Sequence, residues 1–148
     1  MQATHFIVGG CFIGLGRGYI YILYTKVERQ LYIGQTNERG GVIGRLADHI
    51  GSSGTFRSRL NEHGYDLDKI HDLHVFAYLL PNDPRFTGTN RTHREGVEYL
   101  VQKRLHSLRG KLNPPMKIVS FVDPKGAAEQ VVVRRVADQV IEAFLGAY

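Results

Sequence analysis

Arg45 and His49 stand four residues apart in the stretch VIGRLADHI, residues 42–50. If this stretch is a helix, the two side chains lie on one face and can address one site. The planar guanidinium of arginine suits a phosphate, because it stays charged and offers paired hydrogen-bond donors. The alternative is an ordinary pair of solvated surface residues. The spacing therefore predicts either a phosphate-binding site or an exposed helix face.

Tyrosines recur in the segment just before this pair, YIYILYTKVERQLYIGQT, residues 19–36. Val or Ile would pack as well in a half-buried strand and would need no partner for a hydroxyl. Alternation along a strand places Tyr19 and Tyr21 on one face and Tyr24 on the other. If the two apolar runs form paired strands, the hydroxyls of Tyr21 and Tyr32 can converge. Packing alone is the simpler role for Tyr19.

The overall composition is that of a globular, basic protein. The chain has 148 residues, of which 43% are hydrophobic and 22% charged, and its formal net charge is +5 with a pI near 9.5. These values predict one domain with a real core and argue against disorder. A basic domain points to nucleic acid or another polyanion. A merely basic protein with no such partner is the alternative.

Cys11 is the only cysteine, so one chain can form neither an internal disulfide nor a cysteine metal site. This favours a reducing compartment, and we expect a cytoplasmic protein. The apolar run FIVGGCFIGLG at 6–16 has no basic residue ahead of it and is far shorter than the about 20 residues of a membrane span. We therefore expect no membrane segment, and an N-terminal edge strand or Gly-rich lead-in over 6–16.

The first half of the chain predicts two strands and two helices. Apolar runs at 19–24 and 31–35, joined by the polar link TKVERQ, are typical of a β-hairpin. The spacing of apolar residues predicts a helix over 42–50. A second short helix is expected at 56–63, with Ser52 or Ser53 as its N-cap and the pair His63-Gly64 at its end.

The second half continues with a strand at 73–80, a long polar loop at 81–92 and a helix from about Thr92 to Arg109. A further strand is expected at 117–122, and Asp123-Pro124 should open a helix that continues to the C-terminus. In that helix an apolar stripe is expected to pack in the core, although it could instead form a dimer. The stripe consists of Val132, Val136, Val140 and Phe144.

The motifs YIY at 19–21 and LYIGQT at 31–36, followed by an arginine in the next helix, resemble the GIY-YIG nuclease superfamily. Tyr19 stands where that superfamily usually has glycine, whereas LYIGQT matches closely. The resemblance covers about residues 18–115 and leaves 116–148 as a C-terminal extension of a single domain spanning 1–148. It implies an α+β fold in which helices flank a small antiparallel three-stranded sheet, open to extension. A β-β-α-β-α core would be followed by a strand and a helix.

The resemblance also implies a catalytic set drawn from the hairpin, the next helix, a later helix and the loop after it. Its members would be Tyr21, Tyr32, Arg45, His49, Glu98 and Asn113. The metal ligand would be a glutamate of the helix over 92–109, which offers Glu95 and Glu98. Glu98 lies roughly 80° from the centre of the apolar stripe and Glu95 roughly 140° from it. Glu98 is therefore the expected ligand, at the edge of the buried face, and Glu95 is expected to point to solvent.

The implied activity is hydrolysis of DNA phosphodiester bonds with one Mg²⁺ or Mn²⁺ bound to Glu98. Tyr32 or Tyr21 would act as the base or orient the attacking water. A free tyrosine with a pKa of about 10 is a poor base at neutral pH, so the metal, Arg45 or His49 must assist it. His49 would accept a hydrogen bond from Tyr21 and relay its proton, while Arg45 would neutralise the attacked phosphate.

Contacts with the DNA backbone would come from a set of arginines around the site, each of which could instead be a solvated surface residue. These are Arg39, Arg57, Arg59, Arg91 and Arg94. The alternative function is a nucleic-acid-binding module on the same scaffold without cleavage activity. The sequence leaves open DNA versus RNA, and whether specificity comes from the loop at 81–92, the C-terminal segment, a homodimer or a partner protein.

Overall fold

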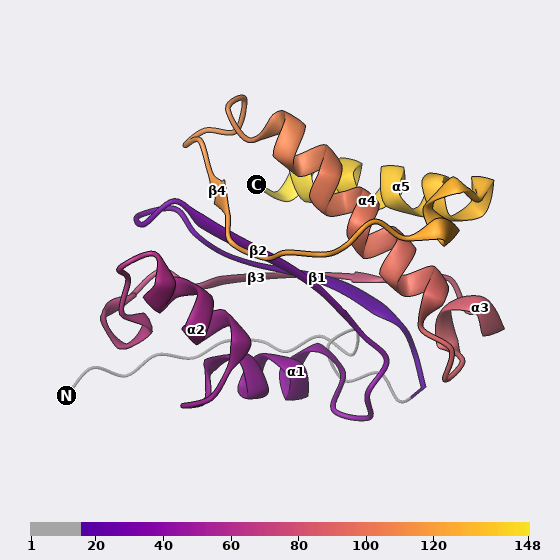
Figure 1. Cartoon of the computed structure of the whole chain (residues 1–148), viewed down its shortest axis with the longest axis horizontal. Coiled ribbons are helices and arrows are strands. Elements are labelled where there is room, and N and C mark those ends of the chain that lie inside the picture. Colours follow the sequence, from indigo (N-terminus) through magenta and orange to yellow (C-terminus); the bar gives the residue numbers. More distant parts are fainter. Residues whose placement is uncertain (1–15) are drawn as a thin grey trace.

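The computed structural model describes residues 16–148, which form an α+β fold (Figure 1). The lead-in expected over 6–16 lies outside the described residues apart from Gly16. In chain order the elements are β1 (Tyr19–Thr25), β2 (Gln30–Thr36), α1 (Gly41–Ile50), α2 (Thr55–Glu62), the 3₁₀ helix η2 (Leu67–Lys69), β3 (His74–Leu79), α3 (Pro84–Thr87), α4 (Thr92–Leu108), β4 (Lys117–Ile118), the 3₁₀ helix η3 (Gly126–Glu129) and α5 (Val131–Ala147).

The hairpin predicted from the two apolar runs is confirmed. β1 and β2 pair antiparallel, with Tyr21 opposite Gly34 and Leu23 opposite Tyr32. Tyr19 and Tyr21 lie on one face of the sheet, and Tyr24 lies on the other, as the alternation predicts. The phenols of Tyr21 and Tyr32 thus share one face.

The sheet is larger than the expected three-stranded antiparallel arrangement. It has four strands in the order β3-β1-β2-β4, and it is mixed. β3 pairs antiparallel with β1, whereas the very short β4 runs parallel to β2, through Gln30 with Lys117 and Leu31 with Ile118. Since β4 pairs with only the first two residues of β2, no described strand pairs with the outer edge of β2 from Tyr32 onward.

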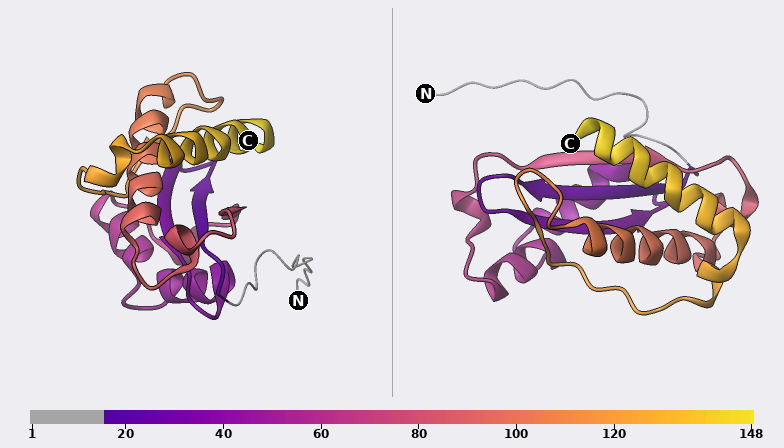
Figure 2. Two further views of the ribbon diagram at one scale, coloured as in Figure 1. Left: turned by 90° about the vertical axis from the view of Figure 1, so that its right-hand side faces the viewer. Right: turned by 90° about the horizontal axis from the view of Figure 1, so that it is seen from above.

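Helices cover both faces of the sheet. Figure 1 shows α4 and α5 on one side and α1 and α2 on the other, and the two turned views in Figure 2 agree with this layering. Each face has its own apolar core. Ile20, Ile22 and Ile33 pack under α4 and α5, while Tyr21 and Leu23 belong to the cluster beneath α1 and α2. The hairpin therefore contributes side chains to both cores.

Four elements differ from the sequence prediction. The strand expected over 117–122 is limited to β4, Lys117–Ile118. The N-cap of α2 is Gly54 and not Ser52 or Ser53, because Gly54 lies closer to the backbone of the last turn of α1 than any side chain would allow. The loop predicted over 81–92 contains α3, in which Asp83 caps the first turn and Pro84 occupies its start. The last helix begins at Val131, well after Asp123-Pro124.

The late start of α5 has a packing reason. Residues 126–129 form η3, in which Ala127 and Ala128 are buried. A side chain at Gly96 of α4 would come within 3.2 Å of the Ala127 Cβ and 3.1 Å of Val133. The absence of a side chain at Gly96 thus lets η3 and the start of α5 approach α4 closely.

The apolar stripe of the last helix packs within the chain. Val136, Val140 and Phe144 are buried in the core under α4 and α5, and Val132 packs against that cluster. This confirms the prediction of intramolecular packing for the stripe. Among the described helices, none combines the length and the apolar character needed to span a bilayer.

Candidate functional site

The centre of the site is a contact between Tyr21 of β1 and His49 of α1. The hydroxyl of Tyr21 lies 2.5 Å from Nε2 of His49, and both side chains are buried. The ring of Tyr32, from β2, makes an edge contact with the His49 ring at a centroid distance of 4.9 Å. The hairpin and the helix after it therefore bring the two phenols and the imidazole together.

The surroundings of His49 set its protonation state. Burial, followed by the positive charge of Arg45, lowers the pKa of His49 to about 4, so that the ring is neutral at pH 7 and one nitrogen can accept. Arg45 lies near enough to Tyr21 to act on its phenol, and it lowers the pKa of that group. The tautomer of His49 sets the direction of the hydrogen bond, because a protonated Nε2 donates to the Tyr21 oxygen and an unprotonated Nε2 accepts from the hydroxyl.

Both phenols hold their protons more tightly than free tyrosine does. Burial, followed by the neighbouring Tyr32, raises the pKa of Tyr21 well above its usual range. Burial, followed by the charge of Glu98, raises the pKa of Tyr32. Arg45 opposes the rise in both cases. The arginine is therefore placed to favour a phenolate, if one forms during a reaction.

Arg45 lies at the boundary between the buried cluster and solvent. Its guanidinium is 3.6 Å from carboxylate oxygens of Glu38 and of Asp48. Its Nε is buried and has no hydrogen-bond partner among the described residues. Two ion pairs of 3.6 Å leave the exposed part of this guanidinium able to bind an additional anion.

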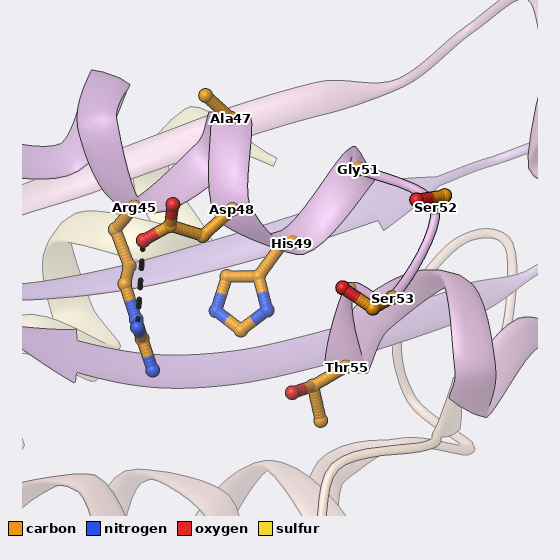
Figure 3. Close-up of a pocket in the computed structure, with 9 residues that line it drawn as sticks. Arg45, Ala47, Asp48, His49, Gly51, Ser52, Ser53 and Thr55 are labelled. Carbon is orange, nitrogen blue, oxygen red and sulfur yellow. Dashed lines mark ion pairs between the residues drawn. The ribbon is translucent and has the colours of Figure 1, made fainter.

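A polar pocket of about 440 Å³ opens beside Arg45 and His49 (Figure 3). Its other walls come from the end of α1 and the turn into α2, and they include the hydroxyls of Ser52, Ser53 and Thr55. Figure 3 shows the Asp48 carboxylate paired with the Arg45 guanidinium at the edge of this pocket. The pocket gives a solvent-borne ligand access to the arginine and the imidazole.

Glu98 joins this cluster from α4, which packs against β2. Burial, followed by the charge of Glu95, raises the pKa of Glu98 to about 7, while Arg45 acts to lower it. The carboxylate also influences the pKa of Tyr21 and of Tyr32, which places it within electrostatic reach of both phenols. It has no hydrogen bond or ion pair with any described residue. Glu98 is thus an unpartnered, half-buried carboxylate within electrostatic reach of the site.

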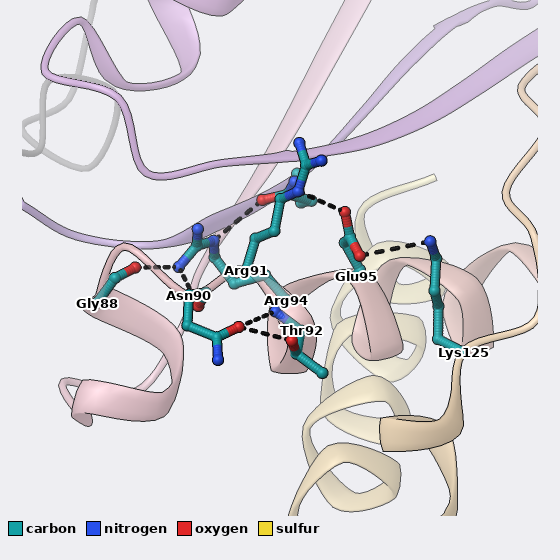
Figure 4. A network of polar contacts seen from close by, with 8 residues as sticks. Gly88, Asn90, Arg91, Thr92, Arg94, Glu95 and Lys125 are labelled. Carbon is teal, nitrogen blue, oxygen red and sulfur yellow. Dashed lines mark hydrogen bonds and ion pairs between the residues drawn. The ribbon is translucent and has the colours of Figure 1, made fainter.

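Glu95 is engaged elsewhere, and not in the way the helical spacing predicted. Its side chain is only 21% exposed and bridges two cations, Nε of Arg91 at 2.9 Å and Nζ of Lys125 at 3.4 Å (Figure 4). The prediction that Glu95 points to solvent is therefore wrong. Since its charge is already neutralised by two partners, Glu98 remains the better candidate for a metal ligand.

Gly34 is the residue of the site that the sequence did not assign, although it is the glycine of the YIG motif. It lies opposite Tyr21 in the β1–β2 pairing. A Cβ at this position would overlap the ring and hydroxyl of Tyr21. The bare backbone of Gly34 thus lets the Tyr21 ring lie across β2, and the position of this glycine within a strand was the available signal.

Asn113 is not brought into the cluster. It is exposed and lies beyond the C-terminal end of α4, whereas Glu98 lies in the N-terminal half of that helix. No hydrogen bond joins its side chain to a described residue of the site. The structure therefore separates Asn113 from the other members of the predicted catalytic set.

Arg94 is a buried structural residue, so its predicted contact with nucleic acid is wrong. Its side chain is 2% exposed. The guanidinium donates to the carbonyl oxygens of Phe86 and Gly88, both at 2.8 Å, and to Oε1 of Gln35 at 3.0 Å. Figure 4 shows it turned toward the Gly88–Asn90 segment. Arg94 ties the segment after α3 to α4 and to β2.

The other arginines predicted to contact nucleic acid lie on the surface, and they differ in whether a protein carboxylate already pairs with them. Arg57 pairs with Asp68 at 2.8 Å, and Arg59 pairs with Glu62 at 2.9 Å. Arg91 is 72% exposed and is paired with Glu95. Arg39 is exposed in the turn before α1 and makes no ion pair with any described residue. Arg39 is therefore the member of the set with the least competition from protein carboxylates.

Glu98 is the unpartnered carboxylate that this site could offer to a divalent cation. Among residues 16–148, no group of three or more His, Cys, Asp or Glu side chains is arranged to bind a metal. Glu98 offers two oxygens with no partner in the described part of the chain, and Mg²⁺ commonly binds through one or two carboxylates while keeping several waters. The unpartnered carboxylate with its raised pKa therefore fits a single Mg²⁺ or Mn²⁺.

Comparison with known proteins does not assign the chain to a family. No protein-family model, no curated protein and no solved structure matches it.

Proposed function

We propose that this protein is a metal-dependent endonuclease that hydrolyses DNA phosphodiester bonds, with a site of the GIY-YIG type. The observation that carries the proposal is the arrangement around Tyr21. Its hydroxyl lies 2.5 Å from Nε2 of a neutral His49, and it lies within electrostatic reach of Arg45 and of the unpartnered carboxylate of Glu98. Acid–base groups, an anion-binding donor and a metal ligand thus gather in one place.

In this proposal Tyr21 and His49 handle the proton of the attacking water. Tyr21 accepts a proton from the water as it passes its own proton to Nε2 of His49, so the tyrosine need not carry a full negative charge for long. The raised pKa of the phenol then does not oppose the step, whereas the lowered pKa of His49 does, and the negative charge that builds on the phosphate favours the protonated imidazole. Tyr32, which contacts the same imidazole ring, orients the water or the phosphate beside Tyr21.

Arg45 binds the phosphate that is attacked. As water adds to phosphorus, negative charge builds on the phosphoryl oxygens, and a guanidinium held at the site stabilises that charge. The new bond joins phosphorus to the water oxygen, and the bond that breaks joins phosphorus to one ester oxygen of the strand. Glu98 would hold the metal, which supplies Lewis-acid stabilisation of the phosphate and of the leaving oxygen when bound.

A plasmid-nicking assay with Mg²⁺, compared with the same protein in EDTA, tests this function. Arg45→Ala is expected to lower the cleavage rate by about 10² to 10³, and His49→Gln by about 10² to 10⁴. Glu98→Gln should abolish the cleavage that depends on Mg²⁺. Arg135→Ala and Glu142→Gln, which change exposed residues of α5, are matched controls and should cleave like the wild type.

The assay also separates the enzyme from a binding module built on the same scaffold. Wild-type protein that binds DNA but leaves the plasmid intact with both Mg²⁺ and Mn²⁺ would overturn the endonuclease proposal. So would wild-type rates of cleavage in Arg45→Ala and Glu98→Gln. Circular dichroism of each variant shows whether a loss of activity comes from a loss of folding.

A further inference from the structure

A second pocket of about 440 Å³ lies on the outer side of α4. One wall is formed by successive turns of α4, through Tyr99, Lys103 and His106, and the other by Ile118, Ser120 and Phe121. Phe121 is 72% exposed. Its ring is therefore open to solvent where it lines the pocket, and it can contact a ligand there. We call this pocket the aromatic groove.

The aromatic groove shares no lining residue with the polar pocket beside Arg45 and His49. Tyr99 directly follows Glu98 along α4. On the opposite wall, the hydroxyl of Ser120 accepts a hydrogen bond from the backbone N–H of Ile33, the neighbour of Tyr32 in β2, and is hydrogen-bonded to the side-chain amide of Gln102. The groove is thus attached to the same two elements, α4 and β2, that supply Glu98 and Tyr32.

The chemistry of the groove combines flat rings with positive charge. Tyr99 and Phe121 offer aromatic surface, and Nζ of Lys103 lies 5.9 Å from the centre of the Tyr99 ring. His106 at the far end is hydrogen-bonded to the guanidinium of Arg109. The lining residues include no carboxylate. A ligand with a planar ring and a negative charge matches this combination, because the ring can lie on the apolar lining and the charge beside Lys103.

We propose that the aromatic groove binds an unpaired base and the adjoining phosphate of a single-stranded stretch of the substrate. The inference rests on the proposed function and narrows it, because it names nucleic acid with an unpaired strand next to the cut as the substrate class. Base faces are available for stacking only where the strand is unpaired, whereas a duplex presents its backbone and base edges. Stacking on aromatic side chains accepts any base, so no sequence preference is expected here.

A tryptophan placed in the groove provides a direct test, since the chain contains no tryptophan of its own. In Phe121→Trp, a short oligothymidylate added in EDTA should quench the tryptophan fluorescence to saturation. A blunt duplex of the same total charge should quench it much less. Leu79→Trp is the matched control, because Leu79 is an exposed residue of β3, at the opposite edge of the sheet from β4, and its signal should not change.

Adding Tyr99→Ala or Lys103→Ala to Phe121→Trp should weaken oligothymidylate binding at least about tenfold.

The inference is overturned if anisotropy shows that the oligonucleotide binds while the introduced tryptophan gives no response. It is also overturned if the fluorescence changes with protein concentration alone and light scattering shows a dimer, because a second copy then fills the groove. Quenching in a protein that never cleaves would refute the proposed function but not the groove. Cleavage without quenching would refute only the groove.

Discussion

Tyr21 of β1 lies over Gly34 of β2, its direct partner across the hairpin. The ring occupies the space that a side chain at position 34 would need. Because Tyr21 is buried against α1 and bonded to His49, the ring cannot swing aside without losing that contact. The glycine and the tyrosine of the two motifs therefore form one packing unit, which fixes the position of the hydroxyl.

Gly34→Ala is expected to move the Tyr21 ring and to lower both stability and activity. The free energy of unfolding should fall by about 1–3 kcal/mol, measured by chemical denaturation, because the extra methyl overpacks a filled site. A displacement of about 1 Å should lower the cleavage rate roughly 100-fold.

Gly44→Ala is the matched control for Gly34→Ala. Gly44 lies within α1, and a Cβ there has no neighbour within 4 Å. Alanine should stabilise the helix by about 0.5–1 kcal/mol and leave the Tyr21–His49 contact unchanged. If Gly34→Ala behaves like Gly44→Ala, the packing unit of Gly34 and Tyr21 does not constrain the site.

The sequence predicts those features of the site that follow from the regular spacing of side chains along one strand or one helix. Alternation along β1 places Tyr21 on the face opposite Tyr24, and the helical spacing of four places Arg45 and His49 on one side of α1. The hairpin loop then fixes the pairing that brings β1 and β2 together. Short-range order of this kind depends on few residues, so the sequence is sufficient.

The parts that pattern missed depend on contacts between segments distant in the chain. Arg94 is spaced three and seven residues before Val97 and Val101, which are buried, so its burial was within reach of the same periodicity. The sequence could not indicate which carbonyl groups would receive its guanidinium. Likewise, the bridge from Glu95 to Lys125 requires the packing of η3 on α4, which no local signal predicts.

Arg94→Ala should destabilise the fold without a direct effect on DNA binding. The variant leaves the carbonyl groups of Phe86 and Gly88 without their donor and opens a cavity, so the free energy of unfolding should fall by about 2–4 kcal/mol. Arg94→Lys should recover less than half of this loss, because an ammonium cannot reach several acceptors in one plane. Denaturant titration measures both effects.

Arg91→Ala is the control for that experiment, since Arg91 belongs to the same helix end but is 72% exposed. Its effect on the free energy of unfolding should stay within about 0.5 kcal/mol. A comparable loss of stability in Arg91→Ala and Arg94→Ala would show that burial of Arg94 does not distinguish the two residues.

The salt dependence of DNA binding should identify which arginines contact phosphates. A plot of log K against log salt is expected to become shallower by about 0.9 in Arg39→Ala, because that residue has no competing carboxylate partner among residues 16–148. Arg91→Ala should change the slope less, since its charge is already paired with Glu95. Arg135→Ala on α5 should leave the slope unchanged. Equal slopes in all four proteins would remove Arg39 from the binding surface.

The raised pKa of Glu98 predicts how stability varies with pH in the absence of metal. A glutamate with a pKa of about 7 in the folded protein and near 4.5 in the unfolded chain is held preferentially protonated by the fold. Its ionisation therefore costs stability as pH rises from about 4.5 to 7, and the cost is complete above pH 7. Glu98→Gln should thus match the wild type near pH 4.5 and exceed its stability at pH 8 by about 2–3 kcal/mol in EDTA.

The comparison between wild type and Glu98→Gln must be made at each pH, because His49 contributes the opposite slope. Its pKa of about 4 in the fold, against 6.5 when free, means that stability is lost as pH falls from 6.5 through 4. The difference between the two proteins, measured by urea denaturation in EDTA, largely cancels this contribution.

With Mg²⁺ at pH 8, the wild type should gain stability and Glu98→Gln should not, since a ligand that binds only the folded state raises its stability. A variant that is less stable than the wild type at every pH would show that the Glu98 carboxylate carries no burial cost, and a Mg²⁺ effect that survives in Glu98→Gln would place the metal elsewhere.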